Sequence, residues 1–237
     1  LIAVSDNVQI MKASQQSAYP MTEEYSREPW MIEFGGDEGK GYVVDIFRVS
    51  GGERHEYTLG GDANRDSYFD TEIALEDYND YLLPPGTSVR MPNSETDTGS
   101  ADGHYYGYIY VQDVKRADIP AGQVNLTLVT EEEGEEQAKL NITSFIGEGN
   151  NELFIGEAPS MRATRLNGTS QDINTEAVKY WMPKMVVRRS GDDLHSTFVT
   201  VMEPHKNDKL ISNIEQLIPA MVKKAERQAL NVLKQRV

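Results

Sequence analysis

The chain has 237 residues, of which 38% are hydrophobic and 26% charged, and its formal net charge is -15. This length allows one large all-β domain or two small ones, and the acidic surplus argues against a nucleic-acid or other polyanion binder, whose surface is normally basic. The absence of cysteine excludes disulfides, thiolate metal sites and cysteine nucleophiles, and no apolar run approaches the roughly 18–20 residues of a membrane span.

The N-terminal part of the chain predicts strands. Residues 1–34 hold short alternating stretches that are typical of strands near the surface. Residues 42–50 (YVVDIFRVS) are apolar on both alternating faces, which predicts a strand buried on both sides in a sandwich or a multilayered β-stack. The paired glycines in the following SGGE turn the chain, because glycine accepts positive φ at little cost. Residues 54–59 (RHEYTL) then return as the partner strand.

The remaining sequence predicts an antiparallel β-sandwich with one irregular region. Residues 60–104 are rich in Gly, Asp, Asn, Ser and Pro, and within them residues 73–86 predict a short helix or a loop that ends at the prolines. The acidic run 131–136 predicts a solvated hairpin tip. Further strand-like stretches recur with turn signals between them, as in a β-sandwich. These stretches are 105–114, 123–130, 138–146, 151–158, 184–190 and 195–204.

The glycine hairpin carries the first candidate catalytic residues. His55 and Tyr57 are two apart on one strand, so their side chains project to the same face about 6–7 Å apart. Such a pair can serve as base and acid in β-elimination from a uronic-acid polysaccharide, with Arg48 or Arg54 facing the carboxylate. In the alternative, His55 and Tyr57 pack against the next layer. Asp45 is then paired with an arginine such as Arg48 or Arg54, because an unpaired buried carboxylate is costly.

Residues 62–73 (DANRDSYFDTEI) resemble a calcium-binding loop. Oxygen-bearing side chains fall at loop positions one, three, five and nine. The two positions that set the loop geometry depart from the pattern, since Ser67 replaces glycine and Ile73 replaces glutamate. A solvated acidic loop is the alternative. The calcium candidates are Asp62, Asn64, Asp66 and Asp70.

Four tyrosines follow one another in residues 103–112 (GHYYGYIYVQ). If this stretch is a strand, Tyr106, Tyr108 and Tyr110 share one face. Exposed, they would form a platform on which sugar rings stack, and they are the candidate substrate-binding residues. Buried, they are ordinary sandwich core.

Only four histidines occur, so a multi-histidine metal site would need most of them. His205 follows a predicted strand beside Glu203, which supplies half a metal site at most, and His195 stands at the other end of the same strand. A strand-end turn is the simpler interpretation.

Three stretches in order, 42–57, 152–165 and 196–204, resemble the C-terminal β-domain of heparinase II/III-like polysaccharide lyases. That family shows a strand pair of the form VVDxFRVxGGxxHDY, followed later by a strand that ends FVTVxEP. Glu56 stands here in place of the aspartate. The matching residues are Asp45, Arg48, Gly51, Gly52, His55 and Tyr57 in the first pattern and Glu203 and Pro204 in the second.

The resemblance implies an all-β fold, a large multilayered antiparallel β-sandwich with a small terminal sheet, joined in the family to an N-terminal α/α-toroid. It implies β-elimination of an acidic polysaccharide, such as a glycosaminoglycan or alginate, by a periplasmic or extracellular bacterial protein. Catalytic residues in the family come largely from the toroid and the strands just after it, so no catalytic role is assigned to this chain. No cofactor is expected here, although a divalent metal is compatible with the full-length protein.

The C-terminal stretch gives conflicting signals. Residues 208–237 have helix-forming composition, yet Pro219 would break or kink a helix. The resemblance instead implies strands over 210–218 and 228–237. We therefore predict a β-sandwich over 1–206 and the start of a small, truncated β subdomain over 207–237, as parts of a longer protein.

The leading hypothesis is the β-sandwich part of such a lyase, inactive without its toroid. The rival is a non-catalytic carbohydrate-binding or scaffold β-sandwich, based on the tyrosine stretch. A calcium-stabilised adhesion domain is a third hypothesis.

Overall fold

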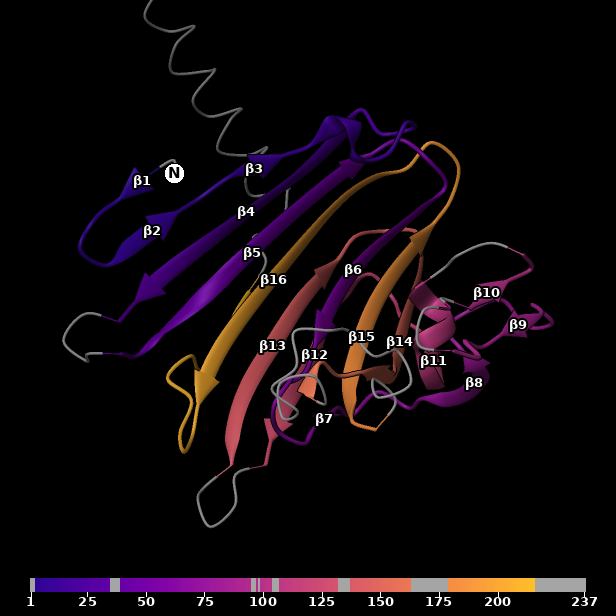
Figure 1. The fold of residues 1–237 in the computed structure, drawn as a ribbon. Coiled ribbons are helices and arrows are strands. Elements are labelled where there is room, and N and C mark those ends of the chain that lie inside the picture. Colours follow the sequence, from indigo (N-terminus) through magenta and orange to yellow (C-terminus); the bar gives the residue numbers. More distant parts are fainter. Residues whose placement is uncertain are drawn as a thin grey trace, which may run out of the picture.

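The computed structural model describes residues 3–34, 39–94, 97, 99–103, 107–131, 137–162 and 179–215. In these residues the chain forms strands β1–β16 and two short 3-10 helices, η1 (Gln16–Ala18) and η2 (Gly107–Tyr110) (Figure 1). The strands pair antiparallel throughout the large sheets. The all-β sandwich prediction is therefore confirmed.

Two large sheets and one small ribbon make up the fold. Sheet A has nine strands in the spatial order β1 (Ala3–Val4), β2 (Val8–Ile10), β4 (Glu24–Glu33), β5 (Gly41–Ser50), β16 (His195–His205), β13 (Ala138–Ile146), β12 (Gly122–Thr130) and β7 (Ser67–Asp70), with β3 (Ala13–Ser14) paired to β4. Sheet B has five strands in the order β6 (Arg54–Gly60), β15 (Trp181–Ser190), β14 (Asn150–Pro159), β11 (Gln112–Asp118) and β8 (Glu76–Tyr81). The ribbon pairs β9 (Val89–Arg90) with β10 (Ser100–Ala101).

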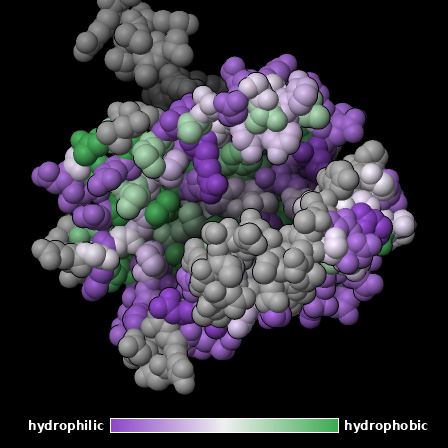
Figure 2. Space-filling view, viewed as in Figure 1, coloured by the Kyte–Doolittle hydropathy of each residue, from purple (hydrophilic) through white to green (hydrophobic). Residues whose placement is uncertain are grey.

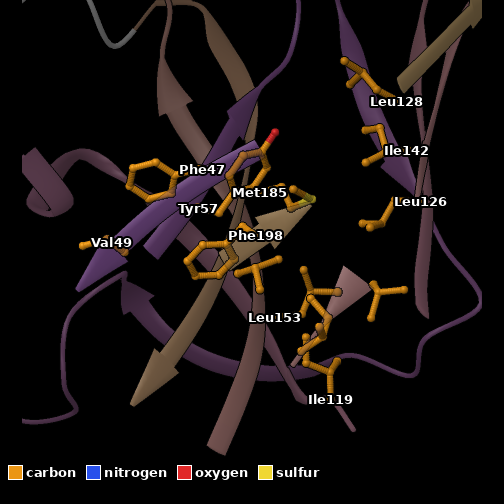
Figure 3. Close-up of a cluster of buried hydrophobic side chains, with 13 residues drawn as sticks. Phe47, Val49, Tyr57, Ile119, Leu126, Leu128, Ile142, Leu153, Met185 and Phe198 are labelled. Carbon is orange, nitrogen blue, oxygen red and sulfur yellow. The ribbon is translucent and has the colours of Figure 1, made fainter. Parts of the chain in front are cut away.

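The main core lies between the inner faces of sheets A and B (Figure 3). At its centre the Phe198 ring of β16 stacks on Phe47 of β5 and on Tyr57 of β6, with ring centroids 5.9 Å apart in each pair. Alternate side chains of each strand point into this core. In β12, for example, Leu126 and Leu128 point inward and are buried.

A third layer covers the opposite face of sheet B. Met185 and Val187 face the main core, whereas Val186 between them belongs to a second buried cluster on the other face. That cluster is closed by Leu82 and Val111, which belong to the connections around β8 and η2. Strand β15 is therefore buried on both faces, as strands in multilayered sheets are.

Sheet A extends beyond the edge of sheet B. The residues Val4, Gln9, Met31 and Val43 lie directly opposite one another across β1, β2, β4 and β5, so they share the inner face. Met31 is 52% exposed and Val4 60% exposed, whereas Tyr25 and Arg27 at the other end of β4 still contact Phe47 and Tyr57, so sheet B covers only part of this inner face. We call this inner face of β1, β2 and β4 the uncovered wing. Figure 2 shows hydrophobic residues gathered over these strands at the left of the view.

Three local predictions are wrong. Residues 76–81 form strand β8 rather than helix or loop, because pairing with β11 overrides local propensity. The tyrosine stretch is not a strand, since residues 107–110 form η2 and β11 begins only at Gln112. The fully buried residues of strand β5 all lie on its inner face, at Asp45, Phe47 and Val49, whereas Val44 and Ile46 on the other face remain partly exposed.

The predicted strand over 210–218 does not form in its described part. Residues 208–215 carry no strand and run back along the outer face of sheet A instead. The hairpin tip 132–136 and the second C-terminal strand, 228–237, lie outside the described residues.

Removal of the central ring should destabilise the sandwich strongly. Phe198→Ala is expected to lower the free energy of unfolding by about 3–5 kcal/mol, because it leaves a cavity between two stacked rings. Met31→Ala, on the uncovered wing, should change it by less than about 0.5 kcal/mol. Urea unfolding followed by tryptophan fluorescence measures both, and equal losses would contradict the position of the core.

Candidate functional site

The glycine turn between β5 and β6 depends on a close backbone approach. Gly51 and Gly52 have φ of +92° and +91°, which residues with a side chain rarely adopt. A Cβ on Gly51 would lie 2.2 Å from the carbonyl oxygen of Met21. Glycine is required at position 51 for both reasons.

His55 fastens this turn from inside. It is 4% exposed, its Nε2 lies 2.8 Å from the carbonyl oxygen of Gly51 and its Nδ1 lies 2.9 Å from Ser196 Oγ. Because a carbonyl oxygen only accepts, Nε2 carries the hydrogen and Nδ1 accepts from the Ser196 hydroxyl. That hydroxyl in turn accepts from Arg189 Nη1 at 3.2 Å. Both ring nitrogens of His55 are thus engaged in holding the hairpin.

Tyr57 lies on the same inner face as His55, as predicted, and binds a buried carboxylate. Its hydroxyl donates to Asp45 Oδ2 at 2.9 Å, and Asp45 is 1% exposed. Arg27 completes the site, donating from Nε at 2.9 Å to Oδ1 and from Nη2 at 2.5 Å to Oδ2. Burial, followed by the negative Asp45, raises the pKa of Tyr57 far above the ordinary tyrosine value.

The predicted partners of Asp45 are wrong. Arg48 pairs with Glu28 at 3.3 Å, and Arg54 lies 3.8 Å from Glu56. Residues 45 and 48 are an odd number apart on one strand, so their side chains point to opposite faces of sheet A. Consequently Arg48 does not join His55 and Tyr57 at a common site.

The tyrosine platform is not formed by the described residues. Tyr108 packs against the second buried cluster, and its hydroxyl donates to Glu56, which also accepts from Arg188 Nε at 2.7 Å. Burial and the adjacent Glu56 raise the pKa of Tyr108. Tyr110 packs against a third cluster around Ile109. Tyr106 lies outside the described residues.

The calcium candidates do not converge. Asp62 accepts from the backbone N–H of Asn64 at 2.7 Å and from Arg65 at 3.1 Å. Asp66 instead pairs with Arg162 at 2.7 Å, and Asp70 stands on β7. Among the described residues no group of three or more His, Asp or Glu side chains is placed to hold a metal ion.

Glu203 and His205 hold the chain after β16. Glu203 is 4% exposed, and its Oε1 accepts from the backbone N–H groups of Leu210 at 2.5 Å and Ile211 at 3.1 Å. His205 Nδ1 donates to the carbonyl oxygen of Asn207 at 3.0 Å. Glu203, the glutamate of the Glu203–Pro204 motif, therefore holds residues 210–211 against sheet A. His195 is exposed at the start of β16.

That segment forms one wall of a polar groove of about 430 Å³ on the outer face of sheet A. The floor is formed by outward-facing residues of β12 and β13, and the opposite wall by residues 70–72. No part of this groove was predicted from the sequence. The signal available was a pair of Asn-x-Thr triplets in neighbouring strands, at 125–127 and 141–143.

No protein-family model matches the chain, and no curated protein matches it either. In the described part of the chain, no helix has the length and apolar character needed to cross a membrane.

The Asp45 site gives a stability prediction. Asp45→Asn keeps the shape but removes the charge that Arg27 and Tyr57 bind, so the free energy of unfolding should fall by about 2 kcal/mol. Asp118→Asn is the matched control, because Asp118 is 73% exposed in its pair with Arg116 and should lose less than about 1 kcal/mol. Chemical denaturation at pH 7 measures both variants, and equal effects would show that Asp45 has no special role.

Glu157 in β14 gives a pH prediction. Burial, and then the negative Asp113, raise the pKa of Glu157 to about 6. Because this folded-state pKa lies above the unfolded one, the protonated Glu157 side chain contributes to the stability of the folded protein. That contribution is complete below the ordinary glutamate pKa and is lost as pH rises through about 6. Glu157→Gln should therefore stabilise the protein at pH 7 by about 1 kcal/mol, allowing for the partial exposure of the side chain, and should have no effect near pH 4. Thermal unfolding at both pH values tests the sign, and a gain confined to pH 4 would refute it.

Proposed function

We propose that this chain is the β-sandwich part of a heparinase II/III-like polysaccharide lyase, and that it supports β-elimination of a uronic-acid-containing polysaccharide without supplying the catalytic set. The observation that carries the proposal is that residues of both family patterns make specific structural contacts. Asp45 and Tyr57 join the two sheets, His55 fastens the glycine turn, and Glu203 anchors the chain after β16. Contacts of this kind hold a fold together and do not form a reaction centre, which supports a structural role for the motif residues.

The chemistry also argues for catalytic groups outside this chain. β-Elimination needs a base for the C5 proton, an acid for the leaving oxygen and a group that neutralises the carboxylate. Here both nitrogens of His55 are bonded, Tyr57 is 3% exposed, and Arg48 lies on the opposite face of sheet A. We therefore infer that an α/α-toroid of the same protein supplies the base and the acid.

The uncovered wing is where this toroid would rest. Its inner face exposes Val4 and Met31, while Arg27 at its border is 53% exposed beside the buried Asp45. A further domain over β1, β2 and β4 would continue the layer that sheet B begins, and burial of these side chains would stabilise the contact.

The rival hypothesis of a tyrosine-based carbohydrate-binding module loses its main support, because Tyr108 is packed and bonded to Glu56. The calcium hypothesis is likewise not favoured by the described contacts of Asp62 and Asp66.

Enzyme assays on two proteins test the proposal. The isolated 237-residue chain should release no unsaturated uronate, seen as ultraviolet absorbance, from alginate, hyaluronan or heparan sulfate. The parent protein that includes the upstream domain should do so on at least one of them. Activity of the isolated chain would place catalysis in this sandwich, and an intact parent that is inactive on every uronate polymer would refute the lyase proposal.

A variant of the parent separates structure from catalysis. His55→Gln should lower the melting temperature while kcat of the folded fraction changes less than about twofold, because His55 holds the hairpin rather than the substrate. A loss of kcat of about 100-fold or more at unchanged melting temperature would make His55 a catalytic residue.

A further inference from the structure

The polar groove on the outer face of sheet A has an ordered arrangement of amide and hydroxyl groups. Asn125 of β12 lies opposite Thr143 of β13, and Thr127 lies opposite Asn141. Two Asn-x-Thr triplets on antiparallel strands thus place each asparagine across from the threonine of the other strand. We call these four residues the Asn–Thr quartet.

Hydrogen bonds fix the orientation of both amides. Asn125 Oδ1 accepts from Thr143 Oγ1 and from Gln123 Nε2, each at 3.0 Å, and Asn141 Oδ1 accepts from Thr127 Oγ1 at 3.3 Å. Each amide oxygen is therefore held, and its NH₂ group is left as a donor. Within the described part of the chain, neither NH₂ group donates to another residue, so both are available to a ligand.

The walls of the groove add acceptors and an apolar contact. Asp70 and Glu72 stand exposed on one side, and on the other side the segment after β16 contributes Ser212, Ile211 and Ile214. Glu203, through its bonds to two backbone N–H groups, holds this second wall in place. The groove thus has donors on the floor, acceptors on one rim and aliphatic side chains on the other.

We propose that this groove binds uncharged sugar units of a glycan chain. Vicinal hydroxyls of a sugar both donate and accept, which matches an amide NH₂ beside a carboxylate, and the apolar face of a sugar ring matches the isoleucine wall. A uronate would instead meet Asp70 and Glu72, and among the described lining residues only Lys209 is basic, so like-charge repulsion disfavours it. The inference goes beyond the lyase proposal and does not depend on it.

Binding to defined oligosaccharides tests this site. Neutral tetrasaccharides of β-1,4-linked glucose, mannose or galactose are titrated into the full chain and followed by the side-chain amide signals in ¹H–¹⁵N NMR spectra, with tetragalacturonate as the charged probe of equal length. At least one neutral probe should shift the Asn125 and Asn141 NH₂ signals, and tetragalacturonate should bind at least about tenfold more weakly.

Variants locate the binding. Asn125→Ala with Asn141→Ala should weaken the neutral probe by about tenfold or more, since two hydrogen-bond donors are lost. The near-isosteric Asn125→Asp with Asn141→Asp should do the same if the alanine variant folds poorly. Thr197→Ala is the matched control, because Thr197 is exposed on the outer face of β16 and does not line the groove.

Three results would overturn the proposal. These are no shift with any neutral probe, equal or tighter binding of tetragalacturonate, and full affinity in both double variants. An inactive parent lyase would leave the proposal standing, because the titration uses this chain alone.

Discussion

The buried Asp45 carboxylate is the constraint around which this sandwich is organised. It is 1% exposed, and an unpaired charge there would cost several kcal/mol. Arg27 from β4 and the Tyr57 hydroxyl from β6 satisfy it, so one carboxylate of β5 ties a sheet A neighbour and the edge strand of sheet B together. Arg27 can do this because it stands where sheet B ends, with its guanidinium partly in water. The uncovered wing begins at this edge of sheet B, which strand β6 forms.

A second constraint follows from the double burial of sheet B. Because Val186 and Val187 of β15 point to opposite faces and are both buried, sheet B needs a cover on each side. Sheet A covers one face, and the irregular segment around η2 covers the other. This cover explains why Tyr108 is packed: its hydroxyl donates to Glu56, which also accepts from Arg188, beneath the segment around η2. Tyr108, which from sequence alone was a candidate for a sugar-stacking platform, therefore belongs to the core on this face of sheet B.

The outer face of sheet A differs from the two faces of sheet B, because it carries polar side chains and a groove. There the alternation that buries Leu126 directs Asn125 and Thr127 outward, and the glutamate of the EP motif brings a second wall over them. A groove arises because a buried carboxylate draws two backbone N–H groups toward the sheet. Its polar ladder is a consequence of strand pairing, since each asparagine amide oxygen accepts from the threonine hydroxyl of the other strand.

Local sequence determined the elements whose pattern is periodic: the strands from 123 to 204, the β5–β6 hairpin and its two glycines, and the inward direction of His55 and Tyr57. The prediction that Arg48 pairs with Asp45 was wrong, because the two residues differ by an odd number and so point to opposite faces of sheet A. Only the tertiary structure decided that Arg27 is that partner, that β8 is a strand and η2 is not, and that Asn125 meets Thr143. Each of these depends on a residue distant in the chain, and a single sequence carries no signal for which strands become neighbours.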